Sequence, residues 1–249
     1  MDHFSPSIKA KSHFSPMPEI ACLTNTGCVR EHNEDAYAAR PELGLWVVAD
    51  GMGGVSGGEV ASAIAVATIV RAVGQGSALS AAMREAHEAI LAAGVAGQGS
   101  PEMGTTAVAL RLDGLHYELA WVGDSRAYLL EQGQPLRQLT QDHSYVQALL
   151  DQGLIDAEQA ASHPYRHLIT RVLGSPEAPA SNADQISGEL QPGDWLLLCT
   201  DGLNGELSDA EIGALMQQAD ALEPAAQALV SAALEQGGHD NVTVILLRV

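Results

Sequence analysis

Residues 45–54 read Leu-Trp-Val-Val-Ala-Asp-Gly-Met-Gly-Gly, and they carry the clearest structural signal in the chain. Its first five residues form an apolar run without alternation, which predicts a strand that is buried on both faces. The run ends at Asp50, and the glycines after it free the backbone for a tight turn. A carboxylate at the end of a buried strand is costly unless it is paired or binds a cation. Asp50 is therefore the first candidate for a functional residue.

Four other aspartates stand in comparable short motifs along the chain. They are Asp35 in Asn33-Glu34-Asp35, Asp124 in Gly123-Asp124-Ser125-Arg126, Asp201 in Thr200-Asp201-Gly202, and Asp240 in Asp240-Asn241-Val242. If the adjoining strands lie side by side, the carboxylates converge and repel one another. Mg²⁺ and Mn²⁺ prefer hard oxygen ligands and relieve such repulsion. The set predicts a multi-metal oxygen site, whereas a single Asp-Gly pair would be read as an ordinary turn.

Apolar periodicity predicts strands in clusters, with helices in pairs between them. Strands are expected at 19–24, 45–49, 105–112, 117–122, 126–130, 195–199 and 242–249, and helices at 59–73, 78–93, 142–152, 208–218 and 222–236. Residues 153–187 are expected to be irregular. This order does not fit a regular β-α-β alternation. We expect an α+β fold in which two packed, mostly antiparallel sheets are flanked by helix pairs in one domain.

The composition limits the classes of function. The chain has 249 residues, 46% of them hydrophobic, and a net charge of −19 with 12 Lys plus Arg. So acidic a balance argues against binding to nucleic acid or to an anionic membrane surface. The odd number of cysteines, three, does not suggest a disulfide framework, so we expect reduced thiols. The sequence shows neither the apolar core of a signal peptide nor a run of about 18 apolar residues that could span a bilayer. We expect a cytoplasmic monomer.

Residues 1–18 differ from the rest of the chain. They contain both lysines and both phenylalanines, and the tetrapeptide His-Phe-Ser-Pro occurs twice, starting at His3 and at His13. Our interpretation is a flexible N-terminal tail. A docking segment is the alternative.

Arg30 is the candidate for binding a phosphoryl group. It lies five residues before Asp35, and a guanidinium can donate to two phosphoryl oxygens at once. An ion pair with Glu31 or Glu34 is the alternative. Glu34 and Asp35 would suit positions around the metals, where they would hold water, or they belong to a capped turn. The sequence around Asp124 is equally consistent with an additional metal ligand and with an aspartate in a hairpin turn.

Taken in order, these motifs resemble those of the metal-dependent serine/threonine protein phosphatases of type 2C, the PPM family, in their compact bacterial form. The resemblance covers about residues 19–249 and rests on Arg30-Glu31-His32-Asn33-Glu34-Asp35, Asp50-Gly51-Met52-Gly53-Gly54, Gly58-Glu59, Gly104-Thr105-Thr106, Gly123-Asp124-Ser125-Arg126, Asp201-Gly202 and Asp240-Asn241. It implies a four-layer αββα sandwich, with a flap subdomain at about 141–187 near the site. It also implies a centre of two Mn²⁺ or Mg²⁺ ions at one end of the sandwich.

The resemblance also implies roles for particular residues. The implied metal ligands are Asp50, the Gly51 carbonyl, Asp201 and Asp240, with Asp124 and Asp201 at a possible third ion. Arg30 matches the phosphate-binding arginine, and it is implied to be catalytic together with Asp50, Asp201 and Asp240. Glu34, Asp35 and Asn241 are expected just outside the ligands.

The implied reaction is hydrolysis of phosphoserine or phosphothreonine in proteins. A water that bridges the two metals would attack phosphorus in line, without a phosphoenzyme intermediate. Such an enzyme would reverse the action of a bacterial Ser/Thr kinase. Met52 stands where some relatives have histidine, and Val55 where many bacterial relatives do. The resemblance therefore assigns no side chain as the acid that protonates the leaving group, and a metal-bound water is the hypothesis. The alternative function is a catalytically silent, metal-stabilised module that binds phosphoproteins.

Overall fold

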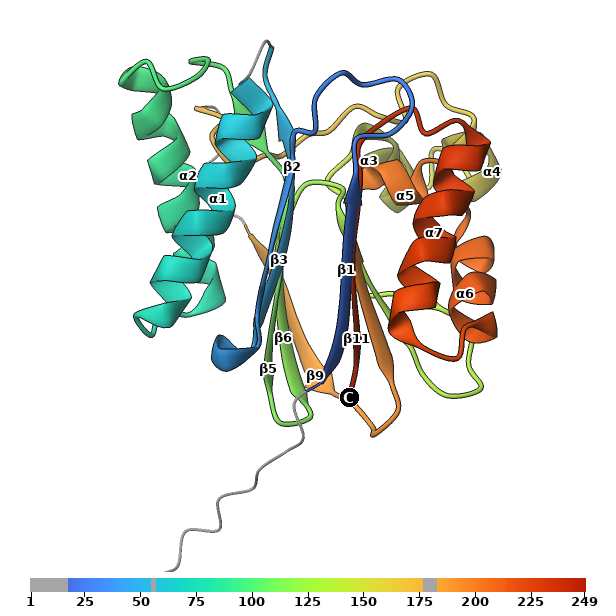
Figure 1. The fold of residues 1–249 in the computed structure, drawn as a ribbon. Coiled ribbons are helices and arrows are strands. Elements are labelled where there is room, and N and C mark those ends of the chain that lie inside the picture. The colour runs from blue at the N-terminus through green and yellow to red at the C-terminus, as the bar shows by residue number, and fades with distance from the viewer. Residues whose placement is uncertain (1–17, 55–56, 177–182) are drawn as a thin grey trace, which may run out of the picture.

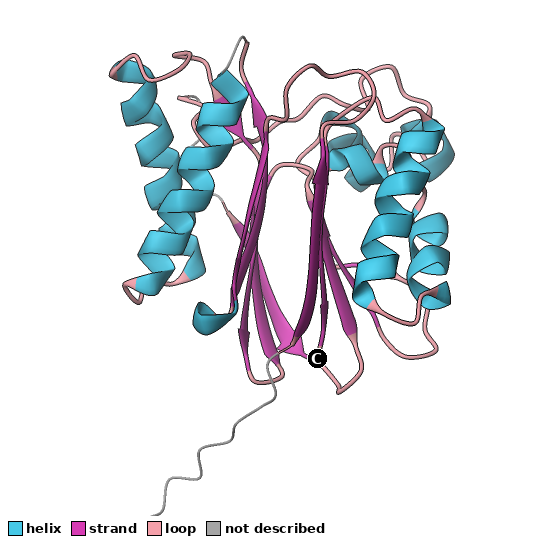
Figure 2. Cartoon of the chain, in the orientation of Figure 1, coloured by secondary structure: helices cyan, strands magenta, loops and turns pink. Residues whose placement is uncertain are grey.

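The computed structural model describes residues 18–54, 57–176 and 183–249 (Figure 1). Within these ranges two antiparallel sheets pack face to face, and helices cover both outer faces (Figure 2). The expected αββα sandwich of the α+β class is therefore confirmed. The predicted flexible tail, residues 1–18, lies outside the described residues except for Pro18.

The strands form two sheets in which neighbouring strands run antiparallel. The first sheet has the order β1 (Glu19–Asn25), β11 (Val242–Arg248), β10 (Trp195–Cys199), β7 (Arg126–Leu130) and β8 (Arg137–Gln138). The second has the order β2 (Asp35–Arg40), β3 (Leu45–Met52), β5 (Ala107–Asp113), β6 (His116–Val122) and β9 (Asp184–Glu189), with β4 (Gly104–Thr105) paired to the end of β3.

Helix pairs form the outer layers, as the view in Figure 1 shows. The second sheet is covered by α1 (Gly57–Gly74) and α2 (Leu79–Val95), and the first by α6 (Asp209–Gln218) and α7 (Leu222–Gln236). Shorter helices are η1 (Pro41–Leu43), α3 (Tyr145–Asp151), α4 (Ala157–Ala161) and α5 (Asp201–Asn204). Helix α5 follows β10 directly, so it places its first residue at the end of the first sheet.

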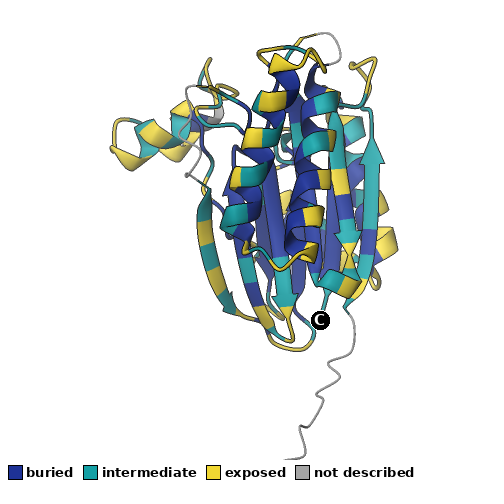
Figure 3. Cartoon of the chain, turned by 90° about the vertical axis from the view of Figure 1, so that its left-hand side faces the viewer, coloured by how far each residue is buried: buried dark blue, intermediate teal, exposed yellow. Residues whose placement is uncertain are grey.

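Strand β3 is buried on both faces because it lies between two cores. Val47 and Ala49 belong to the core under α1 and α2, whereas Trp46 and Val48 belong to the core between the sheets. The central strands are buried, whereas exposed residues lie on the outer turns of the helices, on the loops and on the edge strands (Figure 3). The interpretation of the apolar run as a strand that is buried on both faces is therefore confirmed. The buried strand also sets the position of Asp50.

Helix α1 is the one described helix that is long and apolar enough, by length and composition, to cross a membrane. Its mean hydropathy is 1.3, and 56% of the residues in that window are buried. It packs against β3 and α2, and Ala61, Ala65 and Ile69 are fully buried in that interface. The helix is therefore part of the protein core.

The prediction that residues 153–187 are irregular was wrong in two places. Helix α4 lies in this range, and β9 begins in it and pairs with β6. Strand β2 was also missed. Both β2 and β9 are edge strands whose residues are largely exposed or half-buried. An edge strand has no second neighbour and little apolar surface to cover, so its apolar pattern is weak.

Candidate active site

One end of the sandwich collects most of the motif residues in a cleft of about 840 Å³. Asp50 comes from the end of β3, Asp201 from the start of α5 and Asp240 from the loop before β11. The cleft is also lined by Arg30, Glu34 and Gly51. Strands from both sheets end here, which brings together residues that are far apart in the sequence.

The carboxyl groups at this end strongly disfavour one another's charge. Burial, and then repulsion from Asp201 and Asp35, raise the pKa of Asp50 well above its ordinary value. Burial and the charge of Asp240 raise the pKa of Asp201 as well. Burial penalises the negative charge of Asp50 and Asp201, and the neighbouring charges add to that penalty, so a bound cation would relieve it.

Asp124 and Asp35 do not line the cleft, but the pKa values of both carboxyls are raised as well. Burial raises the pKa of Asp124 to about 8, with a further contribution from Asp201. Burial raises the pKa of Asp35 to about 7, although hydroxyl hydrogen bonds from Thr243 and Thr200 oppose that rise. Asp124 is 6% exposed. The Asp124 carboxyl is thus buried and repels the Asp201 carboxylate. An aspartate in an ordinary hairpin turn on the surface would be exposed to water instead.

Three buried carboxylate oxygens in this cluster have no hydrogen-bond partner among the described residues. They are Asp35 Oδ1, Asp124 Oδ1 and Asp201 Oδ1. Unpartnered buried oxygens with raised pKa values are what a divalent cation would satisfy, since Mg²⁺ and Mn²⁺ take oxygen ligands. The residues present therefore fit an oxygen-ligated metal centre.

Side chains alone do not enclose such an ion. In the part of the chain that the structure describes, no group of three His, Cys, Asp or Glu side chains is arranged to hold a metal. Backbone carbonyls and water are common ligands of Mg²⁺ and Ca²⁺ as well. The converging carboxylates, with their unpartnered oxygens, would supply the anionic part of such a site. The Gly51 carbonyl and water would have to complete the coordination.

Close packing of the backbone requires a glycine at position 51. A Cβ at this position would overlap the carbonyl oxygen of Gly58, and a Cβ at Gly58 would in turn contact the Gly51 carbonyl. The Gly51 amide donates to the Glu34 carbonyl over 3.2 Å. Glycines at both positions therefore let the end of β3, the start of α1 and the Glu34 segment come together.

Arg30 binds an aspartate across the cleft. Its Nη2 lies 2.6 Å from Asp240 Oδ2, and its side chain is 52% exposed. Among the described residues its ion-pair partner is Asp240, and neither Glu31 nor Glu34 takes that place. The guanidinium therefore stands at the mouth of the acidic cluster, beside the cation site that the carboxylates suggest.

Asn241 ties the Arg30 segment to β11. Its Nδ2 donates to the carbonyls of Thr26 (2.8 Å) and His32 (2.9 Å), and its Oδ1 accepts from the Glu34 amide (2.7 Å). The residue is 4% exposed. It thus holds both ends of the loop that carries Arg30.

Two threonines hold Asp35 between the sheets, and sequence reasoning missed both. Thr200 Oγ1 donates to Asp35 Oδ2 over 2.8 Å, and Thr243 Oγ1 donates to the same oxygen over 2.6 Å. Their only sequence signal is that each lies one or three residues from a candidate aspartate. The Asp35 carboxylate therefore links β2 of one sheet to β11 of the other and to Thr200, which lies between β10 and α5.

The segment expected to form the flap does contribute to the cleft. Arg166, His167 and Ile169 line it, together with Glu206 and His239 from the first-sheet side. His239 Nδ1 lies 2.8 Å from Glu206 Oε1, which also accepts from the His239 amide over 2.9 Å. Sequence reasoning did not single out Arg166, His167 or Glu206, because none stands in a motif that marks it.

Comparison with known proteins places this geometry among characterised relatives. A model of the family "Protein phosphatase 2C" matches residues 29–242. Serine/threonine protein phosphatase PstP of Mycobacterium tuberculosis is 38% identical over 232 residues, which cover 91% of this chain and 44% of PstP. The chain thus spans less than half the length of that relative. Serine/threonine phosphatase stp of Listeria monocytogenes is 35% identical over 237 residues, covering 90% of this chain and 93% of stp.

Solved structures agree with the sequence relatives. The crystal structure of the M. tuberculosis phosphatase PstP/Ppp superposes with a TM-score of 0.86 at 37% identity, covering 93% of this chain and 98% of that one. The catalytic domain of PstP in complex with two manganese ions gives a TM-score of 0.82 at 36% identity, with coverage of 93% and 97%.

Proposed function

The chain belongs to the protein phosphatase 2C family, and we propose that it hydrolyses phosphoserine and phosphothreonine in proteins with the help of Mn²⁺ or Mg²⁺. The observation that carries the proposal is the meeting of Asp50, Asp201 and Asp240 beside the Arg30 guanidinium in one cleft. A phosphoryl group needs positive charge at the site, and this chain otherwise carries a net charge of −19. Bound cations and Arg30 would supply it.

The proposed metal ligands are Asp50, the Gly51 carbonyl, Asp201 and Asp240, which would hold two ions. Asp124 and Asp201 would hold a third. The raised pKa values and the unpartnered Asp201 and Asp124 oxygens support this assignment, as does the pair of manganese ions in the PstP structure. When bound, two such ions supply an activated water for in-line attack on phosphorus and neutralise charge on the phosphoryl oxygens.

The chain's own side chains orient the substrate. Arg30 would donate to the phosphoryl oxygens, since its exposed guanidinium reaches the mouth of the cleft. Asn241 fixes the loop that carries Arg30, and Asp35 locks the two sheets behind Asp50. Those contacts hold the guanidinium and the carboxylates in fixed positions while the substrate binds. Charges that are fixed in position before the reaction lower its barrier, because they need not rearrange in the transition state.

The biological setting is proposed from the family alone. The relatives' names describe serine/threonine phosphatases, and such an enzyme would reverse the action of a Ser/Thr kinase on shared protein substrates. A cytoplasmic monomer remains the expectation for this chain.

Hydrolysis of para-nitrophenyl phosphate and of a phosphothreonine peptide tests the proposal. We expect turnover with Mn²⁺ or Mg²⁺ and none after EDTA, with activity restored when the metal is added back. No turnover under any metal, together with calorimetric binding of Mn²⁺, would favour the catalytically silent binding module instead. Turnover that survives EDTA would contradict the metal-dependent mechanism.

A further inference from the structure

His143 is a buried histidine that holds the backbone just before Asp124. The Gly123 amide donates to His143 Nδ1 over 3.0 Å, and the His143 amide donates to the Gly123 carbonyl over 2.9 Å. One residue, 8% exposed, thus binds both backbone polar groups of Gly123. The Gly123 carbonyl belongs to the peptide bond that leads to Asp124, so the position of the Asp124 backbone depends on this contact.

The Gly123 backbone has little room to move. Its φ is +105°, and a Cβ added here would lie 2.5 Å from Cγ2 of Thr106. Thr106 Oγ1 shares a hydrogen bond of 2.7 Å with Ser125 Oγ, and it accepts from the Asp50 amide over 3.1 Å. Thr106 thus connects the loop that carries Asp124 to the end of β3.

His143 also closes the neck of a loop that reaches the catalytic cleft. Its carbonyl accepts from the Thr170 amide over 2.8 Å, and the next residue, Ser144, forms a β-bridge with Ile169. These contacts bring together the two ends of residues 144–169, which we call the flap loop. Three residues of the flap loop line the cleft, namely Arg166, His167 and Ile169. One residue therefore joins the backbone at Asp124 to the neck of the flap loop.

The imidazole ring of His143 is held on one face and at its other nitrogen. Trp121 stacks on the ring with the centroids 6.4 Å apart and 18° between the planes. Arg171 Nη1 lies 2.9 Å and Asp184 Oδ2 3.5 Å from Nε2, and Arg171 donates to Asp184 Oδ1 over 3.0 Å. Burial, and then the charge of Arg171, lower the pKa of His143. The neutral ring is thereby favoured, which leaves Nδ1 able to accept the Gly123 amide.

We propose that His143 is a positioning residue that couples the place of Asp124 to the place of the flap loop, an inference that rests on the proposed metal site at Asp124. Asp124 Oδ1 is buried and has no hydrogen-bond partner among the described residues, so a cation bound there would restrain the loop that carries it. That restraint passes through the two hydrogen bonds of Gly123 to the neck of the flap loop. His143 itself touches neither the cation nor the substrate.

The coupling works in both directions. If a cation at Asp124 stabilises the flap loop, a flap loop held in place raises the affinity for that cation by the same factor. The flap loop carries three residues of the cleft wall, so the wall would be fully ordered only when the cation is bound.

Hydrogen exchange measured by mass spectrometry, without metal and with saturating Mn²⁺, tests the proposal in the full-length protein. In the wild type we expect Mn²⁺ to slow exchange in the flap loop at least about fivefold, the lower end of typical coupling. In His143→Leu the slowing should fall below about twofold, because the Gly123 amide loses its acceptor. His143→Asn should restore it, since the Asn Oδ1 can accept in place of Nδ1. Calorimetry on the same samples shows whether Mn²⁺ binds.

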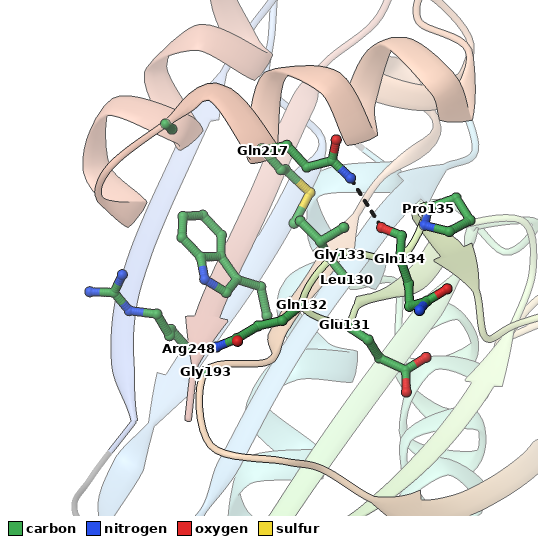
Figure 4. A pocket seen from close by; sticks show the side chains of 12 residues that line it. Leu130, Glu131, Gln132, Gly133, Gln134, Pro135, Gly193, Gln217 and Arg248 are labelled. Carbon is green, nitrogen blue, oxygen red and sulfur yellow. Dashed lines mark hydrogen bonds between the residues drawn. The ribbon is translucent and has the colours of Figure 1, made fainter.

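Two controls separate this role from a general loss of packing. His87 is also buried, and its Nδ1 accepts the Gly174 amide over 3.1 Å, so His87→Leu is the matched control. Gln217→Ala is the distant control. It removes the 3.0 Å hydrogen bond from Gln217 to the Gln134 carbonyl beside a second pocket, of about 710 Å³, at the Trp195 end of β10 (Figure 4). Both variants should keep the effect of Mn²⁺ on the flap loop.

Asp124→Asn provides a test that does not depend on the folding of the histidine variants. It should remove the effect of Mn²⁺ on the flap loop, while calorimetry still shows Mn²⁺ bound at the other carboxylates. The coupling is overturned if Mn²⁺ binds the wild type without slowing exchange in the flap loop. It is also overturned if the slowing is equal in the wild type and in His143→Leu or Asp124→Asn. Each of these results leaves the proposed phosphatase function standing, whereas a wild type that binds no Mn²⁺ overturns both.

Discussion

Asp35 lies directly opposite Asp50 in the antiparallel pairing of β2 and β3. The charge of Asp35 contributes to the raised pKa of Asp50, after burial and the charge of Asp201. The settings of the two carboxyls differ, since Asp35 Oδ2 accepts two threonine hydroxyls whereas Asp50 faces the cleft. One aspartate of the pair thus serves the joint between the sheets, and the other is free for a cation. This division explains how one end of the sandwich tolerates so many carboxylates.

Asp50→Asn and Asp201→Asn should each abolish metal-dependent turnover while the fold survives. An amide cannot replace an anionic oxygen ligand, so we expect a loss of at least about a thousandfold in kcat. In EDTA the variants should melt at or above the temperature of the wild type, because a buried repulsive charge is gone. Steady-state kinetics and thermal melts check both effects, and near-normal turnover in either variant would refute the dinuclear assignment.

The metal-free protein should lose stability as the pH rises from about 4 to about 8. The folded-state pKa values of Asp35 and Asp124, about 7 and about 8, lie above the ordinary value of 3.8. A carboxyl whose pKa is raised by folding stabilises the fold below its unfolded pKa, and this contribution is lost as the pH rises through its folded pKa. Thermal melts in EDTA across this range measure the effect.

Asp124→Asn provides the control for that pH dependence. It removes the group with the higher of the two values, so the fall in melting temperature between pH 6 and pH 8 should be shallower than in the wild type. Saturating Mn²⁺ should reverse the trend in the wild type, because metal binds the deprotonated carboxylates. A slope that is identical in the wild type and Asp124→Asn would contradict the burial of its charge.

Arg30→Ala should mainly raise KM for a phosphothreonine peptide. Loss of charge-assisted hydrogen bonds to a phosphoryl group costs about 1.5–3 kcal/mol, or about tenfold to a hundredfold. Arg30→Lys should recover only part of the loss, since an ammonium lacks the planar fork. Arg71→Ala, which breaks an ion pair with Glu85 on the α1–α2 face, is the matched control. An unchanged KM in Arg30→Ala would remove Arg30 from the phosphate site.

Gly51→Ala should destabilise the fold much more than Gly54→Ala. A methyl group at Gly51 overlaps the Gly58 carbonyl, and such overpacking typically costs about 1–3 kcal/mol or more. At Gly54 no atom lies within 4 Å of an added Cβ, but φ is +68°, so the cost is backbone strain of about 1 kcal/mol. Urea unfolding compares the two, and equal losses would argue against close packing of β3 on α1.

The sequence predicted the fold class where burial leaves a strong apolar signal. The run that precedes Asp50 is such a case, because β3 packs into cores on both faces and needs apolar residues at every position. Strands β2 and β9 lie at sheet edges and carry Ala, Gly and charged residues, so no local pattern marked them. Tertiary pairing, not local preference, makes them strands.

The residues of the candidate site, like the strands, could be predicted only where the local sequence marks them. Aspartates beside strands and glycines could be recognised locally, and the structure brings Asp50, Asp201 and Asp240 to one cleft. The contact between Arg30 and Asp240 joins residues 210 positions apart, and no local pattern encodes it. The hydrogen bonds from Thr200 and Thr243 to Asp35 likewise depend on how the two sheets meet. The position of Arg166 and His167 at the cleft depends on how the flap segment packs on the sheets.

Anomalous X-ray diffraction at the manganese edge, from crystals grown with Mn²⁺, would locate the metal ions themselves. We expect two strong peaks in the cleft, contacted by Asp50, the Gly51 carbonyl, Asp201 and Asp240, and both peaks should vanish or weaken in Asp201→Asn crystals. An empty cleft at saturating Mn²⁺, or manganese bound only away from these carboxylates, would contradict it.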